Sequence, residues 1–576
     1  MCRKKLFTPF FLLALVTAGL QGLPHSGPGK NPAVEKTPVE KAPVTDGHAK
    51  PLPVQEINLT VFSNYLYREN FFYRGLLQNE NLFLVGKNLS GSIRASFETG
   101  GIFLKDADLH LHSSFTDKQG LLFDSCNLLF MLRYESWLET VVSVHYGEYL
   151  GSKDDDLGYL QPLRPGRKPA NPGFYLGVFF TRFLLADSSA LRVELSLGRQ
   201  WLKDTYLVEG IFENFLYPVK FDGVYLTIQN NLMGKFQILA ADILQLYQNW
   251  NNEPAGYKNL SQDSPEIIAN YDGDLLSFRS GIFYETPSLI TAPGGVKWAI
   301  YLNTLFTRYG PVTSGVDRAG FSGAFADNDY LLHYGIGSFF KAPGLALFFE
   351  FCRSEGIDRQ MPGLFGDTRD IETNGNFFRA SLLALLPPLT PLLPIKNTNH
   401  AVHVNLIFSE GPVFDNYGNQ KTYGFVSPGN HDFGGFLLNQ VWGFRPYALS
   451  LNNGFANNRS YGFYHASGIL AAGLAYTLLL SAHANIQFQS WFLFDASLDA
   501  TENIFQKSAN FENFFDRHIG NETMVTLFST INRVVEMSLS FDVFAPGGLY
   551  QSFNHGIYGD KKDFFYGLYF DLKIRF

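Results

Sequence analysis

The last fourteen residues of the chain limit its possible folds more strongly than any other stretch. From Phe564 to Phe576 every second residue is apolar, and most of the residues between them are polar or charged. Successive side chains of a β-strand point to opposite faces, so the pattern predicts a strand with one apolar and one polar face. The stretch is longer than the usual strand of about 5–6 residues. It is long enough to cross a bilayer, which takes about 9–11 residues of tilted strand. An edge strand of a soluble β-sandwich is the alternative.

The same alternation recurs along the chain, for example over residues 128–135, 191–198, 402–409 and 535–543. Residues 461–484 lack charged side chains but contain histidine, serine and glycine, which favours a strand plus a turn over a single helix. We estimate about 18 strands, with 16 as the fallback, because outer-membrane barrels usually have an even number.

The segments between these strands divide into short and long connections. Gly100-Gly101, Ser136-Trp137 and Met233-Gly234 are predicted tight turns. Long polar loops rich in Gly, Asn and Asp are predicted over residues 151–172, 250–272, 310–328, 356–374, 410–460 and 495–515. Short turns on one side and long loops on the other are typical of outer-membrane barrels. The predicted fold is therefore all-β: a transmembrane antiparallel β-barrel with short periplasmic turns and long extracellular loops.

The N-terminal region predicts export from the cytoplasm. Residues 1–22 have a basic start, an apolar run and small residues near the end, as in a secretory signal peptide. Residues 23–56 are rich in proline and form a predicted extended periplasmic linker. The barrel is predicted over residues 57–576. Because no separate plug domain precedes a first strand near Leu59, we expect a pore. The final residue, Phe576, is similar to the terminal aromatic residue of bacterial outer-membrane barrels, which the barrel assembly machinery reads.

Composition excludes several classes of function. The net charge of −8 and the lack of a basic stripe argue against nucleic-acid binding. No nucleophile elbow, phosphate loop or zinc-protease motif is present, so we expect neither an enzyme nor a cofactor. His110 and His112 could bind a metal with Asp108, but a polar patch facing the lumen is favoured. Whether Cys126 and Cys352 form a disulfide stays open.

Three stretches resemble the alginate-export family of outer-membrane barrels. The first is Arg68-Glu69-Asn70. The second combines Gly198, Arg199 and Gln200 with Phe221, Asp222 and Gly223, and the third combines Gly520 and Glu522 with residues 544–547. The resemblance implies an 18-strand barrel that passes an anionic polymer or a small solute. Met524 and Val525 depart from the family pattern, which has an acidic residue there.

If the apolar face of each strand meets lipid, the charged side chains on alternate positions face the lumen or its rim. A charge on the lipid side would cost about 2–4 kcal/mol at the midplane of the membrane. The channel-lining residues predicted in this way are Arg94, Glu98, Arg133, Glu135, Arg192, Glu194, Arg279, Arg379, Lys573 and Arg575. Arg199 breaks the rule, because it shares the apolar face of Leu195 and Leu197. Either it sits at the membrane interface or a bulge at Gly198 turns it inward.

The sequence therefore predicts a monomeric, porin-like channel in the outer membrane of a Gram-negative type of cell. Its expected partners are outer-membrane lipid, the barrel assembly machinery and a small solute or polysaccharide. The mixed signs of the lining residues indicate at most a weak preference for anions or neutral solutes. A barrel-anchored adhesin or receptor that uses the long loops is one alternative, and a secreted soluble lectin or glycan enzyme is another.

Overall fold

The structure is a computed structural model of the whole chain. It describes residues 83–84, 88–105, 118–151, 173–201, 207–208, 211–214, 220–242, 278–292, 295–308, 330–358, 371–386, 400–411, 413–414, 420–422, 424–425, 469–481, 483–496, 518–531, 534–547 and 564–575. Within these ranges no helix is long and apolar enough to cross a membrane. The predicted signal peptide, the linker, Leu59, residues 68–70, Asp108, His110, His112 and Phe576 lie outside the described residues.

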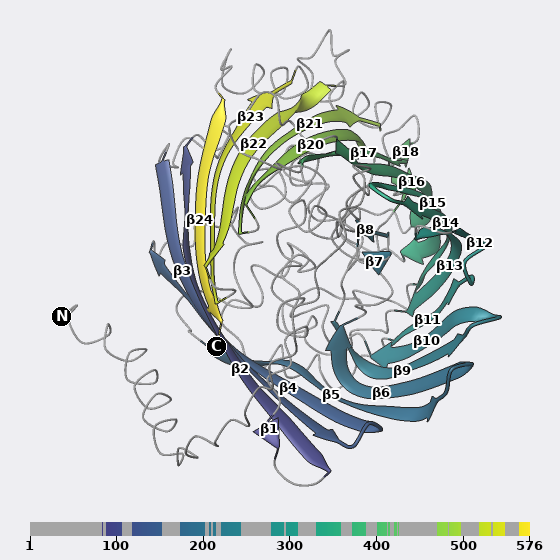
Figure 1. The fold of residues 1–576 in the computed structure, drawn as a ribbon. Coiled ribbons are helices and arrows are strands. Elements are labelled where there is room, and N and C mark those ends of the chain that lie inside the picture. Colours follow the sequence, from purple (N-terminus) through teal and green to yellow (C-terminus); the bar gives the residue numbers. More distant parts are fainter. Residues whose placement is uncertain are drawn as a thin grey trace, which may run out of the picture. The chain divides into compact units, whose positions relative to one another are not determined.

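Eighteen long strands pair in chain order to form one closed antiparallel sheet (Figure 1). They are β2 (Leu89–Lys105), β3 (Lys118–Tyr134), β4 (Leu138–Gly151), β5 (Gly173–Asp187), β6 (Leu191–Trp201), β9 (Lys220–Asn230), β10 (Gly234–Asp242), β11 (Phe278–Glu285), β13 (Val296–Arg308), β14 (Tyr330–Ala342), β15 (Leu345–Asp358), β16 (Ile371–Leu386), β17 (His400–Ser409), β20 (Ile469–Ser481), β21 (Ala484–Asp495), β22 (His518–Ile531), β23 (Val535–Pro546) and β24 (Phe565–Arg575). The last strand pairs with the first, from Ser96↔Arg575 to Lys105↔Tyr566, which closes the barrel. The predicted fold class and the central estimate of 18 strands are confirmed.

Short and long connections alternate along most of the barrel, as predicted, but residues 387–399 form a longer connection between β16 and β17 on the short-turn side. Turns at Glu135–Trp137 and Asn231–Met233 join β3 to β4 and β9 to β10. The stretch from Tyr461 to Ala484 contains strand β20 and its turn into β21, as expected. The predicted turn at Gly100-Gly101 is wrong. Both glycines lie inside the 17-residue β2, paired with Phe123 and Leu122. Because glycine has no side chain, it does not show which face of the strand its position belongs to. Two glycines in a row therefore interrupt the alternating pattern without ending the strand.

Short strand pieces lie outside this ring of eighteen. β1 (Phe83–Leu84) pairs with the beginning of β2, and β12 (Ile290–Ala292) pairs with β13 beside a turn. β7 (Leu207–Val208) pairs with β8 (Phe212–Glu213), and β18 (Val413–Phe414) pairs with β19 (Gln420–Thr422). The last two pairs belong to connections on the long-loop side, and they position the candidate site.

The two faces of the wall differ as the alternation requires. Outward positions carry large apolar side chains that remain exposed, among them Leu302 on β13 (46%) and Phe349 (48%) and Phe351 (44%) on β15. The residues between them point inward and are buried: Asn303 and Thr307 on β13, and Glu350 and Ser354 on β15. A soluble sheet would show the reverse, with apolar side chains buried and polar ones exposed. The exposed apolar face is therefore the lipid-facing surface of a transmembrane barrel.

A charge placed on this surface tests its orientation. Leu302 lies in the middle of β13 and faces outward, so Leu302→Arg should destabilise the folded barrel by about 2–4 kcal/mol. The measurement is urea unfolding of the protein in lipid vesicles. The matched control, Leu302→Met, keeps the position apolar and should change stability by less than about 1.5 kcal/mol. An arginine tolerated as well as methionine would show that this face does not meet lipid.

Candidate functional site

The connection between β6 and β9 enters the barrel. Its two short strands, β7 and β8, lie inside the ring of wall strands in Figure 1. The backbone N–H of Ile211 donates to the carbonyl of Val208 at 2.9 Å, which closes the turn between them. Val208, Ile211 and Phe212 are 1–2% exposed. These described residues, 207–208 and 211–213, are called the inward hairpin below.

The inward hairpin packs on an apolar patch of the inner wall. The patch is made by β13 to β17, which lie several strands away from β6 and β9 around the ring. Its buried residues are Ala299, Tyr301, Phe339, Ala346, Phe348, Leu383 and Ala401. Phe212 is the centre of the contact: its ring lies 5.9 Å from Phe348 and 6.2 Å from Phe339, centroid to centroid. Burying this apolar surface holds the hairpin across part of the lumen.

A second segment enters from the connection after β17. β19 makes a parallel contact with β16 at Glu372↔Thr422. Phe425, which follows, is 0% exposed and stacks on Phe377 of β16 at 5.0 Å. Gly375 of β16 permits this approach, because a Cβ there would lie 1.9 Å from the backbone nitrogen of Phe425.

Hydrogen bonds tie this second segment to the wall. The carboxylate of Glu410 accepts from the backbone N–H of Asn376 at 3.0 Å and from its side-chain amide at 2.9 Å. The backbone N–H of Phe425 donates to the carbonyl of Glu410 at 2.9 Å. Glu410, Thr422 and Phe425, described residues at the start of this long connection, thus contact β16.

Buried polar side chains occupy the inner wall between these two contacts. Arg379 of β16 and Glu350 of β15 are direct cross-strand neighbours and are 1–2% exposed. Ser381 donates to the side-chain oxygen of Asn405 at 2.6 Å. The Arg379 guanidinium carbon also lies 5.8 Å from the centroid of the Phe377 ring. Arg379 was predicted to line the channel, whereas Glu350 was not, because apolar residues occupy both faces of β15 around it and hide the alternation.

The other predicted lining residues follow their strand parity. Arg94 on β2, Arg279 on β11 and Lys573 on β24 all have buried side chains on the inner face. Arg279 donates from Nε to the hydroxyl of Thr307 at 3.1 Å. Glu98 pairs in register with Lys573 across β2 and β24, and Arg575 pairs with Ser96. The side chains of Glu98 and Arg575 lie outside the described part of the structure.

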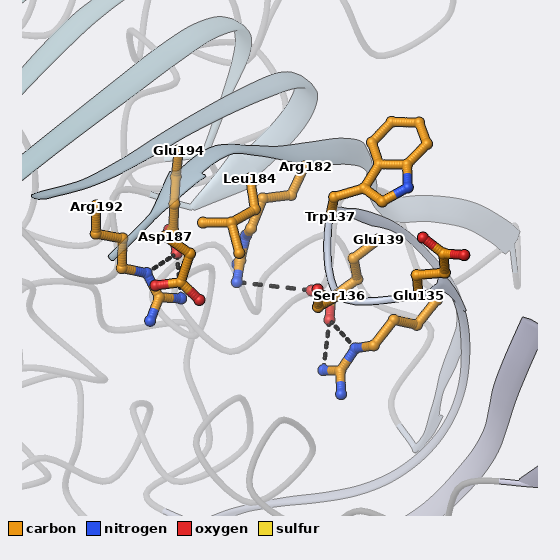
Figure 2. A pocket seen from close by; sticks show the side chains of 10 residues that line it. Glu135, Ser136, Trp137, Glu139, Arg182, Leu184, Asp187, Arg192 and Glu194 are labelled. Carbon is orange, nitrogen blue, oxygen red and sulfur yellow. Dashed lines mark hydrogen bonds and ion pairs between the residues drawn. The ribbon is translucent and has the colours of Figure 1, made fainter. Parts of the chain in front are cut away.

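Four predicted residues come together at the short-turn rim, as Figure 2 shows. Arg133, Glu135, Arg192 and Glu194 border an open pocket of about 370 Å³. Two further lining residues, Glu139 and Arg182, were not predicted. The sequence could have identified Glu139 through the short turn between β3 and β4, because that turn places Glu139 opposite Arg133 in register.

Ion pairs neutralise much of the charge in this rim pocket. Glu139 lies between two arginines: Arg133 Nη2 is 2.7 Å from Oε2, and Arg182 Nη1 is 3.6 Å from Oε1. Arg192 donates from Nε to Glu194 Oε1 at 2.6 Å. With Glu135 and Asp187, the pocket has three arginines and four carboxylates. Such a balance indicates a cross-braced wall more than a selective ring of one sign.

The second motif stretch forms one cross-strand unit. Gly198 pairs with Gly223, Arg199 with Asp222, and Gln200 with Phe221 across β6 and β9. Arg199 donates to both carboxylate oxygens of Asp222, at 2.8 Å from Nε and 2.7 Å from Nη2.

The position of Arg199 follows from this pairing. The register runs without a shift through Gly198 in both pairings of β6, so Arg199 keeps its outward parity and no bulge turns it inward. Gly198 has φ +118° and contacts the carbonyl of Phe179, where a Cβ would approach to 2.3 Å. A bidentate carboxylate therefore accompanies the outward arginine near the long-loop end of β6.

The third motif stretch also pairs across two strands. Gly520 of β22 lies opposite Pro546 of β23, and Glu522 lies opposite Phe544. A Cβ at Gly520 would lie 2.5 Å from the Phe544 ring, so the small residue lets the ring lie against the backbone. Glu522 is 0% exposed on the inner face. In each of these two motifs, the two halves lie on neighbouring strands and pair in register, which their spacing in the sequence did not show.

Other candidate sites are not assembled in the described residues. No group of three or more His, Cys, Asp or Glu side chains there could hold a metal ion. Cys126 on β3 and Cys352 on β15 are both free cysteines, and Cys352 is buried.

Removing the centre of the hairpin contact should open the lumen. Phe212→Ala removes a buried aromatic ring, a change that costs about 3–5 kcal/mol in a packed core. We expect the inward hairpin to detach and single-channel conductance to rise. The matched control is Phe349→Ala, which removes a ring of the same size from the lipid-facing side of β15. Unchanged conductance in Phe212→Ala would show that the hairpin does not restrict the channel.

The outward ion pair should couple energetically. Asp222→Asn removes the carboxylate that pairs with Arg199, and Arg199→Gln removes the guanidinium that pairs with Asp222. A double-mutant cycle on unfolding free energy should give a favourable coupling of about 0.5–3 kcal/mol, because the two groups are in direct contact. Additive single effects would mean that each side chain is solvated independently.

The comparisons with known proteins give structural likenesses only. No family model matches the sequence, and no curated protein matches it. Solved structures that resemble it include OccK9 (OpdG) of Pseudomonas aeruginosa, with 11% identity, a TM-score of 0.45, and coverage of 84% of this chain and 98% of that one. OccAB1 of Acinetobacter baumannii has 11% identity, a TM-score of 0.43, and coverage of 84% and 96%. OprB of Pseudomonas putida has 9% identity, a TM-score of 0.39, and coverage of 85% and 94%. The strand pairing of the chain itself establishes the barrel.

Proposed function

We propose that the chain is a passive channel in the outer membrane that admits small solutes through its lumen. The observation that carries this proposal is the closed barrel with an apolar outer face, a polar inner face and a hairpin packed inside. A barrel of 16–18 strands is too wide for its own side chains to fill, so it leaves an aqueous passage. The two inward segments then set how much of that passage remains.

The inward segments favour small solutes over a long polymer. Both lie on the inner face of the same wall sector, β13 to β17, and both are held by buried aromatic contacts. A polymer would have to pass them along its whole length, whereas a small solute passes once. The long connection after β17 also starts inside the barrel, which supports a role in the channel for its first part.

Export of an anionic polysaccharide is the narrower form of this proposal, and membership of the alginate-export family would imply it. The two motif stretches that pair across β6–β9 and β22–β23 support the family resemblance. The mixed charges of the inner wall argue against a channel dedicated to anionic polymers. Its buried bases, Arg94, Arg279, Arg379 and Lys573, are mixed with the buried acids Glu350, Glu522 and Asp542.

We also propose that the barrel works as a monomer in outer-membrane lipid and that the assembly machinery reads its C-terminal Phe576. The preceding strand, β24, ends at Arg575 and closes the barrel against β2.

Electrical recording tests the proposed function. The refolded mature chain in a planar bilayer should give steady single-channel openings, because a barrel of this width leaves an aqueous passage. Under a salt gradient the reversal potential should show weak anion preference or none, given the mixed signs of the wall. Strong cation selectivity would contradict the expected weak preference for anions. A barrel that inserts without conducting would overturn the channel and favour a barrel-anchored receptor.

A further inference from the structure

One sector of the inner wall carries no charge. Between Ile469 and Phe494, which covers β20 and nearly all of β21, the sequence contains no Asp, Glu, Lys or Arg. The strands on other sides of the lumen place buried or paired ions inward, as at Arg133, Arg279 and Arg379. The uncharged sector is therefore a distinct chemical surface within the channel.

Amide side chains form a ladder along β21 in this sector. Asn485, Gln487 and Gln489 occupy successive inward positions and are only 1–2% exposed. Gln487 donates to the hydroxyl of Thr477 on β20 at 3.0 Å. Within the described structure, four of their polar atoms have no hydrogen-bond partner: Asn485 Oδ1, Gln487 Oε1, Gln489 Oε1 and Gln489 Nε2. Buried polar groups without partners are unfavourable, so they gain from any ligand that both donates and accepts.

Hydroxyl groups extend the ladder sideways. Gln487 pairs in register with Thr477 on one side and Thr526 on the other, and Thr526 pairs with Ser540 on β23. The hydroxyls of Thr526 and Ser540 are 3.0 Å apart. One row across four adjacent strands therefore consists of neutral hydrogen-bonding side chains that face the lumen.

An indole ring completes the sector at its long-loop end. Trp491 follows Gln489 on the inner face of β21 and is 2% exposed. Its six-membered ring covers Gly473 of β20, where a Cβ would lie 2.6 Å from the ring. The small residues Ala471 and Ala475 flank Gly473 on the same face. The indole nitrogen is a further buried donor without a partner among the described residues.

We propose that this sector, Asn485, Gln487, Gln489 and Trp491 with Thr477 and Thr526, is a binding track for a neutral polyhydroxylated solute such as an oligosaccharide. The inference rests on the proposed channel function and names its substrate class. Hydroxyl groups match amides because both donate and accept, and the indole N–H of Trp491 is a further donor beside them.

Anionic sugars fit the track poorly. Glu522 lies opposite Trp491, and Asp542 lies opposite Met524, the register partner of Gln489. Both carboxylates are buried on the inner face. The sector itself has no Lys or Arg that could pair with the carboxylates of an anionic chain, whereas its amides can bind a neutral sugar.

The test compares blocking of single-channel current by maltotriose and by tri-galacturonate in the full mature protein. The wild type should be blocked by the neutral sugar at lower concentration than by the anionic one. The double variant Gln487→Leu, Gln489→Leu should weaken block by maltotriose roughly tenfold, since several hydrogen bonds are lost. Its conductance in salt alone should remain near that of the wild type.

Gln237→Leu is the matched control. Gln237 is also a buried inward glutamine, but it lies on β10, outside the sector. Its substitution should leave block by maltotriose unchanged. Equal effects of the two glutamine variants, no effect of the double variant, or stronger block by tri-galacturonate would each overturn the inference.

A binding measurement separates this inference from the channel proposal. Calorimetric titration of the detergent-solubilised protein with maltotriose should show binding that the double variant weakens and Gln237→Leu does not. Current without sugar binding would support the proposed channel and contradict the proposed binding track. Sugar binding without current would support the binding track and contradict the channel. The shift in electrophoretic mobility on heating checks that each variant is folded.

Discussion

Closure of the sheet is the constraint on which the rest of this structure depends. Backbone N–H and C=O groups in lipid have no water to bond, so every strand needs a neighbour on both sides. The pairing of β24 with β2 supplies the last of these neighbours and removes both sheet edges. Once the ring is closed, each strand has one face toward lipid and one toward the lumen. The alternation of apolar and polar side chains is the direct consequence.

The width that closure creates is the next problem for the chain. Eighteen strands enclose more space than inward side chains can fill. Part of the space is taken by the inward hairpin, and this explains why the inner wall is not polar throughout. Phe339, Phe348 and Leu383 face the lumen yet are apolar, because Val208, Ile211 and Phe212 cover them. On β13 to β17 the apolar part of the inner wall is thus the place where the hairpin packs, while a second buried apolar cluster lies on the inner face of β3, β4 and β5 (Leu129, Met131, Val141, Val178 and Phe180).

These relations decide what could be predicted from the sequence. The strands, their faces and the strand number were accessible, because the alternation is local and repeats along each strand. Inward positions such as Arg94, Arg279 and Lys573 followed from parity alone. The prediction of a turn at Gly100-Gly101 was wrong because glycine has no side chain to show which face of the strand it occupies. The hairpin contact was out of reach, because Phe212 and its partners on β14 and β15 are far apart in the sequence. The partner of Arg199 was equally hidden, since only the β6–β9 register brings Asp222 beside it.

The distribution of charge on the wall bears on how such a channel can discriminate. Where ions occur, many are neutralised by a neighbour across the strands, as Glu139 is by Arg133 and Arg182. Paired ions brace a wall but project little net field along the lumen, particularly when salt screens them. An ion passing the wall therefore meets a weak field. Discrimination then depends on the width left beside the inward segments and on direct hydrogen bonding to the wall. The side chains with buried, unpartnered amide groups on β21 belong to a pair of strands, β20 and β21, whose residues from Ile469 to Phe494 carry no charge.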